Sequence, residues 1–285
     1  MFTWGAVGLV VVVVLVVVVV SQTSRNAPIS GLHFTPKPVP ATIAGEITHV
    51  PVSSFNAAGP GLAEITHPVV LSEQPALTFT GKPGIFGLFG EFCPFCAAER
   101  WAVITSLSRF GTFRGLKTMQ SSPKDTAPRT QTFEFATATY SSPYVSAKLL
   151  EMFGQDKATG RHPIIKRPTK VEEKLIEKYD PTGTIPLFDI GNKLFVTGAT
   201  YSPTVLKGLS RATIAAGLSH PSDLVARLIL AASNCLSAGI CAIDGGSPHP
   251  VCASVGVRDA AMALGLRIQR APATDAGPGT SIEKT

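Results

Sequence analysis

The sequence predicts an α/β domain built on a mixed sheet and preceded by an N-terminal transmembrane helix. Three observations lead to this prediction. Residues 5–20 are mostly valine and carry no charge. Downstream, segments with strand-like alternation are interspersed with amphipathic helical ones. A Cys-x-x-Cys pair, Cys93 and Cys96, stands where an apolar, Gly-rich strand runs into a helix. The length of 285 residues suits one large domain, or two small ones, with appendages.

Residues 1–24 are expected to be a membrane anchor or a signal segment. The run over residues 5–20 is close to the shortest length that crosses a bilayer. Val19 and Ser21 are alternatively the small residues of a signal-peptide cleavage site. We favour the uncleaved anchor because no Ala-x-Ala site follows. Its predicted location is the cell membrane, crossed once, with the domain outside the cytoplasm.

Composition excludes several classes of function. The net charge is +6, but basic residues are scattered, and those over residues 166–178 alternate with acids. This pattern is typical of a solvated helix face, so we expect no nucleic-acid partner. The six histidines lack paired metal spacing, and neither a P-loop nor a dinucleotide fingerprint is present. We therefore expect no cofactor and no metal.

Domain boundaries follow from shifts in composition. Residues 25–45 are rich in Pro, Ser and Thr, which favours an extended linker. Residues 46–255 are expected to form the folded domain. Residues 256–285 are expected to be a C-terminal helix and a disordered tail, which begins near residue 271.

Within the domain, each element is predicted from its periodicity and its flanking residues. Strands are expected over residues 76–89 (two strands and a loop), 116–121, 130–138 and 185–196 (two strands around a Gly-Asn turn). Helices are expected over residues 96–110, 143–179 with a break at 154–168, and 222–243 with Ser222 as N-cap and Asp223 in the first turn.

The Cys-x-x-Cys pair carries the predicted chemistry. Cysteines three residues apart at a helix start face each other, so they can close into a disulfide and reopen. Pro94 suits the first helical turn, where its missing N–H would have no partner. The positive end of the helix lowers the pKa of Cys93, which makes it the attacking sulfur and leaves Cys96 to resolve the mixed disulfide. Phe92, Phe95 and Trp101 are expected to give apolar surroundings.

Alternatives to redox chemistry are a structural disulfide and half of a zinc site. A zinc site requires a second ligand pair, and the sequence has no further Cys-x-x-Cys or His-x-x-x-His. We favour redox chemistry. Glu91 is a candidate proton shuttle beside the cysteines, although a solvated loop acid is the interpretation that we prefer.

The order of strand, Cys-x-x-Cys, helix, further strands and helices, then Thr184-Ile185-Pro186 and a β-hairpin resembles the thioredoxin fold. This resemblance implies that Pro186 is cis and that the backbone of Ile185 pairs with an extended substrate. A trans proline entering an edge strand is the alternative. About ninety residues separate Cys96 from Pro186. A helical insertion at about residues 141–180, as in periplasmic disulfide oxidoreductases, would fill this gap.

Several motifs also resemble an uncharacterised prokaryotic family, the domain of unknown function 929. They cover residues 91–102, 107–113, 140–146, 178–181 and 238–241, with a later Val251-Cys252. The resemblance extends from about residue 45 to residue 252. It implies a thioredoxin-like domain that is commonly tethered to the membrane outside the cytoplasm, and it names no substrate.

The remaining cysteines lie near the C-terminus. Cys235 and Cys241 are six apart on a predicted helix, which places their side chains off a common face and disfavours a bond between them. Cys235 is expected to be a small buried apolar residue. Turn-forming residues 244–248 lie between Cys241 and Cys252, so a chain reversal can join these two in a structural disulfide. A second redox pair, or a zinc site that adds Cys235 and His249, are the alternatives.

Together these observations predict a membrane-tethered, extracytoplasmic thiol–disulfide oxidoreductase. Its expected partners are protein thiols and disulfides, and its N-terminal helix contacts the membrane. One alternative is a non-enzymatic thioredoxin-like binding module whose disulfides are structural. The other is a redox carrier for a membrane partner protein.

Overall fold

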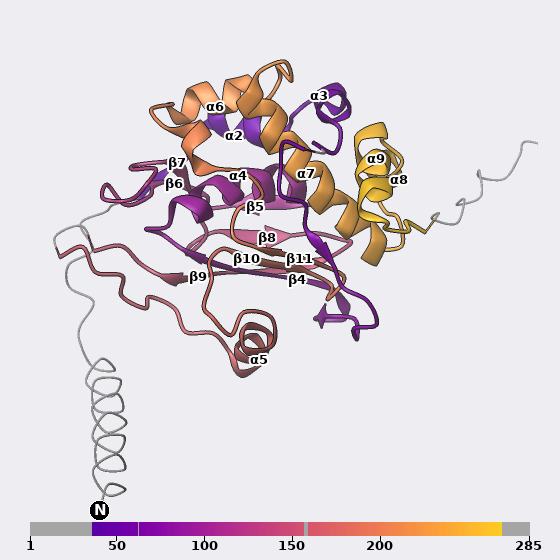
Figure 1. Ribbon diagram of the computed structural model, residues 1–285, viewed down its shortest axis with the longest axis horizontal. Coiled ribbons are helices and arrows are strands. Elements are labelled where there is room, and N and C mark those ends of the chain that lie inside the picture. Colours follow the sequence, from indigo (N-terminus) through magenta and orange to yellow (C-terminus); the bar gives the residue numbers. More distant parts are fainter. Residues whose placement is uncertain (1–35, 62, 157–158, 270–285) are drawn as a thin grey trace, which may run out of the picture.

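The computed structural model describes residues 36–61, 63–156 and 159–269. The predicted membrane anchor (residues 1–24), the first part of the predicted linker and the predicted C-terminal tail lie outside the described residues. The described part is a mixed α/β structure in which helices cover both faces of a central sheet (Figure 1).

The central sheet is organised around one long strand, β4 (Lys82–Gly90). This strand pairs in parallel with β9 (Ser146–Phe153) and antiparallel with β10 (Leu187–Ile190). Three further strands extend the sheet: β11 (Leu194–Thr197), which pairs with β10; β2 (Val69–Val70), which pairs with β11; and β3 (Thr78–Phe79), which pairs with the start of β4. The strand pairs predicted over residues 76–89 and 185–196 are confirmed.

The sequence of β4 accounts for its central position. Ile85, Phe86, Leu88 and Phe89 are all buried, so the strand is apolar on both faces, as a strand covered by helices on both sides must be. Gly87 stands between them because a Cβ atom there would lie 2.6 Å from the Phe89 ring and 3.0 Å from the Phe188 ring.

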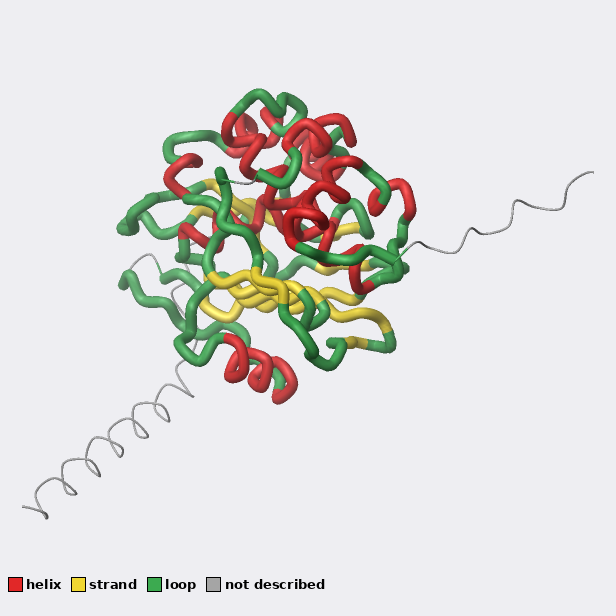
Figure 2. Tube along the Cα trace, turned by 45° about the vertical axis from the view of Figure 1, so that its right-hand side comes forward, coloured by secondary structure: helices red, strands yellow, loops and turns green. Residues whose placement is uncertain are grey.

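Helices pack on the two faces of this sheet in unequal numbers (Figures 1 and 2). One face carries α4 (Pro94–Leu107) and α7 (Leu224–Ile243), over which lie α2 (Ala41–Thr48), α3 (Val52–Ala58), α6 (Arg211–Gly217) and α9 (Val255–Leu264). Among the described residues, one helix, α5 (Lys170–Tyr179), lies against the other face, where Leu175 packs in a smaller apolar cluster. Two short helical turns lie in the connections: η1 (Pro203–Leu206) between β11 and α6, and α8 (His249–Cys252) between α7 and α9.

Two small sheets flank the helix that follows the cysteines. One contains β1 (Lys37–Pro38), β6 (Lys117–Gln120) and β7 (Gln131–Glu134), and the other contains β5 (Thr112–Arg114) and β8 (Thr139–Ser141). The strands predicted over residues 116–121 and 130–138 are therefore confirmed, with shorter bounds.

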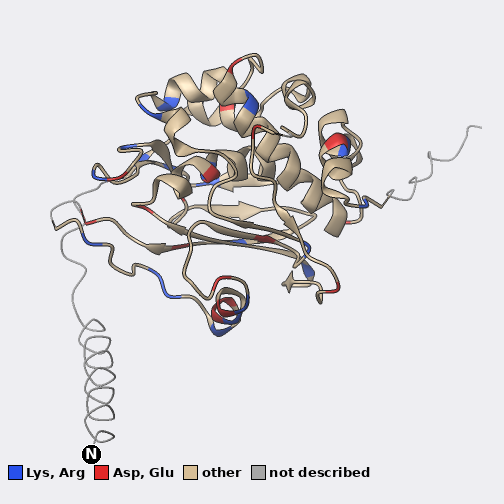
Figure 3. Ribbon diagram, in the orientation of Figure 1, with Lys and Arg blue, Asp and Glu red and all other residues tan. Residues whose placement is uncertain are grey.

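Figure 3 marks the positions of the charged residues along the ribbon. Some of their side chains are buried, among them those of Glu99, Arg100 and Glu151. Helix α7 has the length and composition of a membrane span, but 83% of its most apolar window is buried inside the structure. Its packing against α4 and α9 is that of a core helix.

The predicted N-cap of this helix, Ser222, is one residue too early. Asp223 caps the helix instead, and its Oδ1 accepts the backbone N–H of Val225 at 2.7 Å.

Three further predictions, which concern secondary structure and domain bounds, differ from the structure. The segment 143–179 is not largely helical, because residues Ser146–Phe153 form strand β9 and only α5 is a helix there. Leu149, Leu150, Glu151 and Met152 favour helices in isolation, but pairing with residues 84–90 of β4 overrides that propensity. The predicted linker ends earlier than residue 45, because α2 begins at Ala41 and packs against α4 and α6. The folded unit also continues past residue 255, since α9 packs on α7 and α3.

Candidate functional site

The Cys93–Cys96 pair lies where the central strand meets its helix. Strand β4 ends at Gly90, and α4 begins at Pro94, so Cys93 is the N-cap residue. The Sγ atom of Cys93 accepts the backbone N–H of Cys96 at 3.3 Å. Because Pro94 has no N–H to satisfy, the helix starts there without losing a hydrogen bond. The predicted helix start is thus confirmed to within two residues.

The cis-proline loop lies directly beside the first cysteine. The Ile185–Pro186 peptide bond is cis, and the Sγ atom of Cys93 donates to the carbonyl oxygen of Ile185 at 3.6 Å. The Sγ atom of Cys96 accepts the backbone N–H of Gly90 at 3.4 Å. Both cysteines are free thiols. Residues separated by about ninety positions in the chain therefore meet at one place.

The two thiols have different environments. Cys93 is 5% exposed and Cys96 is fully buried. The pKa of Cys93 is lowered, first by the hydrogen bond from the Cys96 thiol, which outweighs the effect of burial. The pKa of Cys96 is raised well above its ordinary value, chiefly because burial penalises its charged form. Cys93 is consequently the sulfur that ionises, and Cys96 stays protonated.

Aromatic side chains form the rim of the site. The half-buried ring of Phe92 stacks on His162, with centroids 3.5 Å apart. Phe95 is 43% exposed and stands on the open side of the helix start. Trp101 has a different position from the one expected, because it is fully buried and its Nε1 donates to the carbonyl oxygen of Gln131 at 2.9 Å. It anchors α4 to β7 and does not line the site.

Glu91 is buried, so the preferred interpretation of this residue as a solvated loop acid is wrong. Its side chain accepts the backbone N–H of Gln155 at 2.9 Å, which holds it under the loop after β9. Burial, and next the charge of Glu151, raise the pKa of Glu91 to about 7. A carboxyl group that titrates near neutral pH is suited to accepting and returning a proton.

Two buried charged residues on α4 were not singled out in the sequence. Arg100 is fully buried and pairs with Glu151. Glu99 is also fully buried, where its Oε2 accepts the backbone N–H and the hydroxyl of Thr200 at 2.9 and 2.8 Å. The sequence feature that could have pointed to them is a Glu-Arg pair within a largely apolar helix, with Arg100 one helical turn after Cys96.

The C-terminal cysteines, Cys241 near the end of α7 and Cys252 in α8, lie toward the far end of α4 from Cys93. Cys241 and Cys252 are bonded to each other, with Cα atoms 5.6 Å apart. Ser237, one turn before Cys241, contacts Ser106 in the last turn of α4. The 14 residues of α4 span about 20 Å, so this disulfide is far from Cys93.

That disulfide also bears on the zinc alternative, since two of the four proposed ligands are bonded to each other. Among the described residues, no group of three His, Cys, Asp or Glu side chains is arranged to hold a metal ion. Cys235 is a free, buried thiol whose Sγ donates to the carbonyl oxygen of Pro60 at 3.7 Å.

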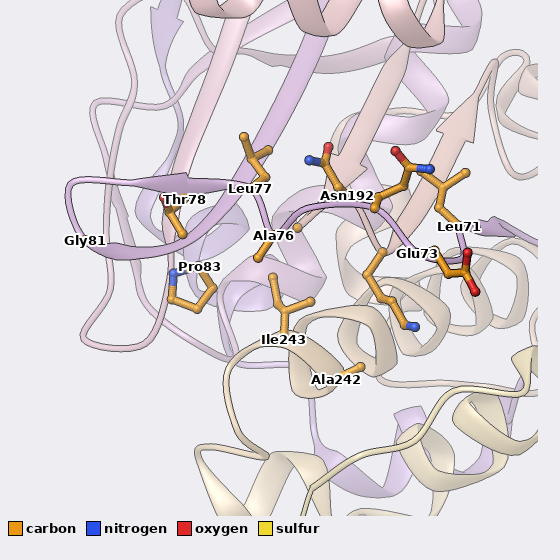
Figure 4. Close-up of a pocket in the computed structure, with 13 residues that line it drawn as sticks. Leu71, Glu73, Ala76, Leu77, Thr78, Gly81, Pro83, Asn192, Ala242 and Ile243 are labelled. Carbon is orange, nitrogen blue, oxygen red and sulfur yellow. The ribbon is translucent and has the colours of Figure 1, made fainter.

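A cavity of about 340 Å³ lies at the opposite end of β4 from the cysteines (Figure 4). It is lined by residues between Leu71 and Gly81, by Asn192 in the β10–β11 turn, and by Ala242 and Ile243 at the end of α7. Pro83 in its wall precedes Gly90 by seven residues of strand, roughly 23 Å. The cavity is therefore not part of the cysteine site.

The fold and the site together define an α/β protein with a Cys-Pro-Phe-Cys dithiol at a helix N-terminus, next to a cis-proline loop. Residues 68–182 match the family model described as "Domain of unknown function (DUF929)". The resemblance to this family is confirmed over that stretch, which contains both cysteines and ends before Pro186. Neither a curated protein nor a solved structure matches the chain.

Proposed function

We propose that this chain is a thiol–disulfide oxidoreductase with a thioredoxin-like core. The strand order β9–β4–β10–β11 supports this fold, with β9 parallel to β4 and β10 antiparallel to it. So does the sequence of elements, in which α4 follows β4, α5 precedes the cis-proline, and α7 follows β11. The proposal rests above all on the position of the Cys93 thiol, which is hydrogen bonded to Cys96 and lies 3.6 Å from the carbonyl oxygen of Ile185.

The proposed reaction begins with the thiolate of Cys93. It attacks one sulfur of a substrate disulfide, and the other substrate sulfur leaves as a thiolate. Cys96 then loses its proton and attacks the Sγ of Cys93, which releases the second substrate sulfur. The substrate disulfide gains two electrons, and the Cys93–Cys96 pair becomes a disulfide. The same steps in reverse oxidise a substrate dithiol.

Proton transfer is the step that needs assistance, because burial keeps Cys96 protonated. Glu91 directly follows Gly90, whose N–H contacts the sulfur of Cys96. With a pKa of about 7, its carboxyl group can accept the proton of Cys96 and return it. We assign Glu91 this role in the mechanism.

The substrate is proposed to be an extended polypeptide segment. Thr184 is exposed and Ile185 is half-buried, so the backbone before Pro186 borders the surface next to Cys93. Phe95 and the stacked Phe92 and His162 provide an apolar rim around the same point. Backbone pairing gives affinity without a strict sequence requirement, which suits protein thiols and disulfides as substrates.

We further propose that the domain is held outside the cytoplasm by the segment at residues 1–24. The bond between Cys241 and Cys252 supports an oxidising compartment, because such bonds persist mainly there. In this location the pair would exchange electrons with a membrane redox partner or directly with secreted substrates.

The experiment is to trap the intermediate. A Cys96→Ser variant keeps the attacking sulfur but removes the resolving one, so mixed disulfides with cellular proteins should accumulate and disappear on reduction. A Cys93→Ser variant is the matched control and should trap none. If Cys96→Ser forms no mixed disulfides although its Cys93 reacts with a small alkylating agent, the proposed enzymatic function is overturned.

A binding module is the second candidate, and the 5% exposure of Cys93 is the observation that favours it. In that case the cysteines only stiffen the start of α4 when they are oxidised. A Cys93 that resists alkylation in the folded protein, but reacts after unfolding, would support this candidate.

A further inference from the structure

Arg100 is a fully buried cation one helical turn beyond Cys96. Its Nη2 atom donates to the carbonyl oxygen of Gly90 at 3.1 Å and to Glu151 Oε1 at 2.5 Å. Its Nε and Nη1 atoms have no hydrogen-bond partner among the described residues. The guanidinium carbon lies 5.3 Å from the ring centroid of Phe89 and 5.8 Å from that of Phe135. This cation therefore has unused donors in a dry, aromatic environment.

Gly90 connects this cation to the cysteines. Its carbonyl group accepts from Arg100, and its own N–H donates to the sulfur of Cys96 at 3.4 Å. The positive charge of Arg100 also acts on both thiols and lowers the pKa of each, although for Cys96 the effect of burial is larger. Phe95, the second of the two residues between the cysteines, carries no charge. Arg100, a cation beneath the pair, can therefore stabilise the thiolate as a positively charged residue at that position would.

Glu151 is the counter-charge of this cation. It is fully buried on β9, and its second oxygen accepts the backbone N–H of Phe135 at 3.3 Å. Glu134 and Glu91 are buried in the same region; besides burial, the charges of Glu151 and Glu134 raise the pKa of Glu91, and the charge of Glu134 also raises that of Glu151. A lone buried arginine would be strongly destabilising, so Glu151 makes its presence possible while reducing the field that reaches the cysteines.

We infer that Arg100 is a positioning residue that stabilises the thiolate form of the Cys93–Cys96 dithiol, and that Glu151 limits this effect and thereby sets the redox potential of the pair. The inference rests on the proposed function and deepens it. Reduction of the disulfide adds two electrons and yields one thiolate and one thiol. A cation that stabilises the thiolate favours this reduced form, which makes the pair a stronger oxidant.

The inference predicts opposite effects for two substitutions. Glu151→Gln keeps an oxygen acceptor for Arg100 but removes the negative charge, so the thiolate becomes more stable. We expect the equilibrium with glutathione to move toward the reduced protein by roughly tenfold, equivalent to about 30 mV for a two-electron couple. The double variant Arg100→Gln, Glu151→Gln removes both charges and should move the equilibrium toward the disulfide by a similar factor, because the stabilising cation is lost.

Two further variants separate this electrostatic role from a structural one. Arg100→Lys keeps the cation and should stay within about threefold of the original equilibrium constant. Glu99→Gln removes a buried carboxylate from the neighbouring position of α4, where Thr200 and not Arg100 is its partner. It should leave the equilibrium unchanged. All variants are measured as the full chain in a glutathione redox buffer, with the pH dependence of Cys93 alkylation as a second readout and circular dichroism as the check on folding.

The outcomes distinguish this inference from the proposed function. If the unsubstituted protein shows no thiol–disulfide exchange, the proposed function fails. If it exchanges normally, but Glu151→Gln moves the equilibrium toward the disulfide or leaves it unchanged, Arg100 does not set the potential. The same conclusion follows if Glu99→Gln shifts the equilibrium as much as Glu151→Gln. Should Glu151→Gln not fold, because it leaves Arg100 without its counter-charge, the direction of the shift in the double variant decides. Should the double variant not fold, the sign of the Glu151→Gln shift decides.

Discussion

Replacing Glu99 by glutamine should remove a large pH dependence of stability. This carboxyl group is fully buried on α4, where Thr200 supplies two hydrogen bonds to Oε2. Its other oxygen, Oε1, has no partner among the described residues. Burial raises the pKa of Glu99 from an ordinary value of 4.5 to about 7, against the opposing effect of the Thr200 hydrogen bonds.

The sign and size of the effect follow from linkage. Because the pKa is higher in the folded protein than in the unfolded chain, the contribution to stability is fully present below pH 4.5 and is lost as the pH rises through about 7. The interval of about 2.5 between the two pKa values corresponds to about 3 kcal/mol in total. About 2.5 kcal/mol of this falls between about pH 5 and pH 8.

The assay is urea unfolding of both proteins at several pH values. A glutamine side chain cannot ionise, so the variant lacks this loss of stability. The free energy of unfolding of Glu99→Gln, relative to that of the original protein, should therefore rise by about 2.5 kcal/mol from about pH 5 to about pH 8. Other raised carboxyl pKa values, such as those of Glu91 and Asp189, act in both proteins and cancel in the difference. A difference that does not change with pH would show that Glu99 is hydrated or paired, and would refute the argument from burial.

Two other predictions concern the C-terminal disulfide and the proposed proton acceptor, Glu91. Replacing Cys241 and Cys252 by alanine opens a loop with a sequence separation of 11 and should lower the free energy of unfolding by roughly 3 kcal/mol, as measured by urea unfolding. Unchanged thiol–disulfide exchange in that variant would show that the pair is structural, whereas lost exchange would support the alternative that Cys241 and Cys252 are a second redox pair. Replacing Glu91 by glutamine should slow resolution of the mixed disulfide by roughly tenfold or more and remove the inflection near pH 7 from its rate, as followed by stopped-flow kinetics. If the pH dependence of the rate keeps this inflection in Glu91→Gln, a group other than Glu91 accepts the proton of Cys96.

The sequence was most informative where local chemistry decides structure. The helix after Cys93 follows from Pro94 and the apolar spacing after it, and the β10–β11 hairpin follows from its Gly-Asn turn. Asp223 was correctly placed at a helix start, although its role as the cap was assigned to its neighbour. These features depend on residues within a few positions of one another.

Features that depend on distant residues were less accessible. Strand β9 has the composition of a helix and becomes a strand only because β4 offers a partner along its whole length. The burial of Glu91 depends on Gln155, and the pairing of Arg100 depends on Glu151, about fifty positions away. The cysteine pair could be found from its local motif, but the charges beneath it depend on the packing of α4 against the strands.

The most direct test of the central claim is the reduction potential of the Cys93–Cys96 pair, measured from the fraction of disulfide in glutathione buffers of known ratio. Exchange catalysis requires a bond that opens and closes under cellular conditions, so we expect a value between about −120 and −270 mV. A value below about −300 mV, or a pair that never equilibrates with glutathione while the protein is folded, would contradict the proposed redox function.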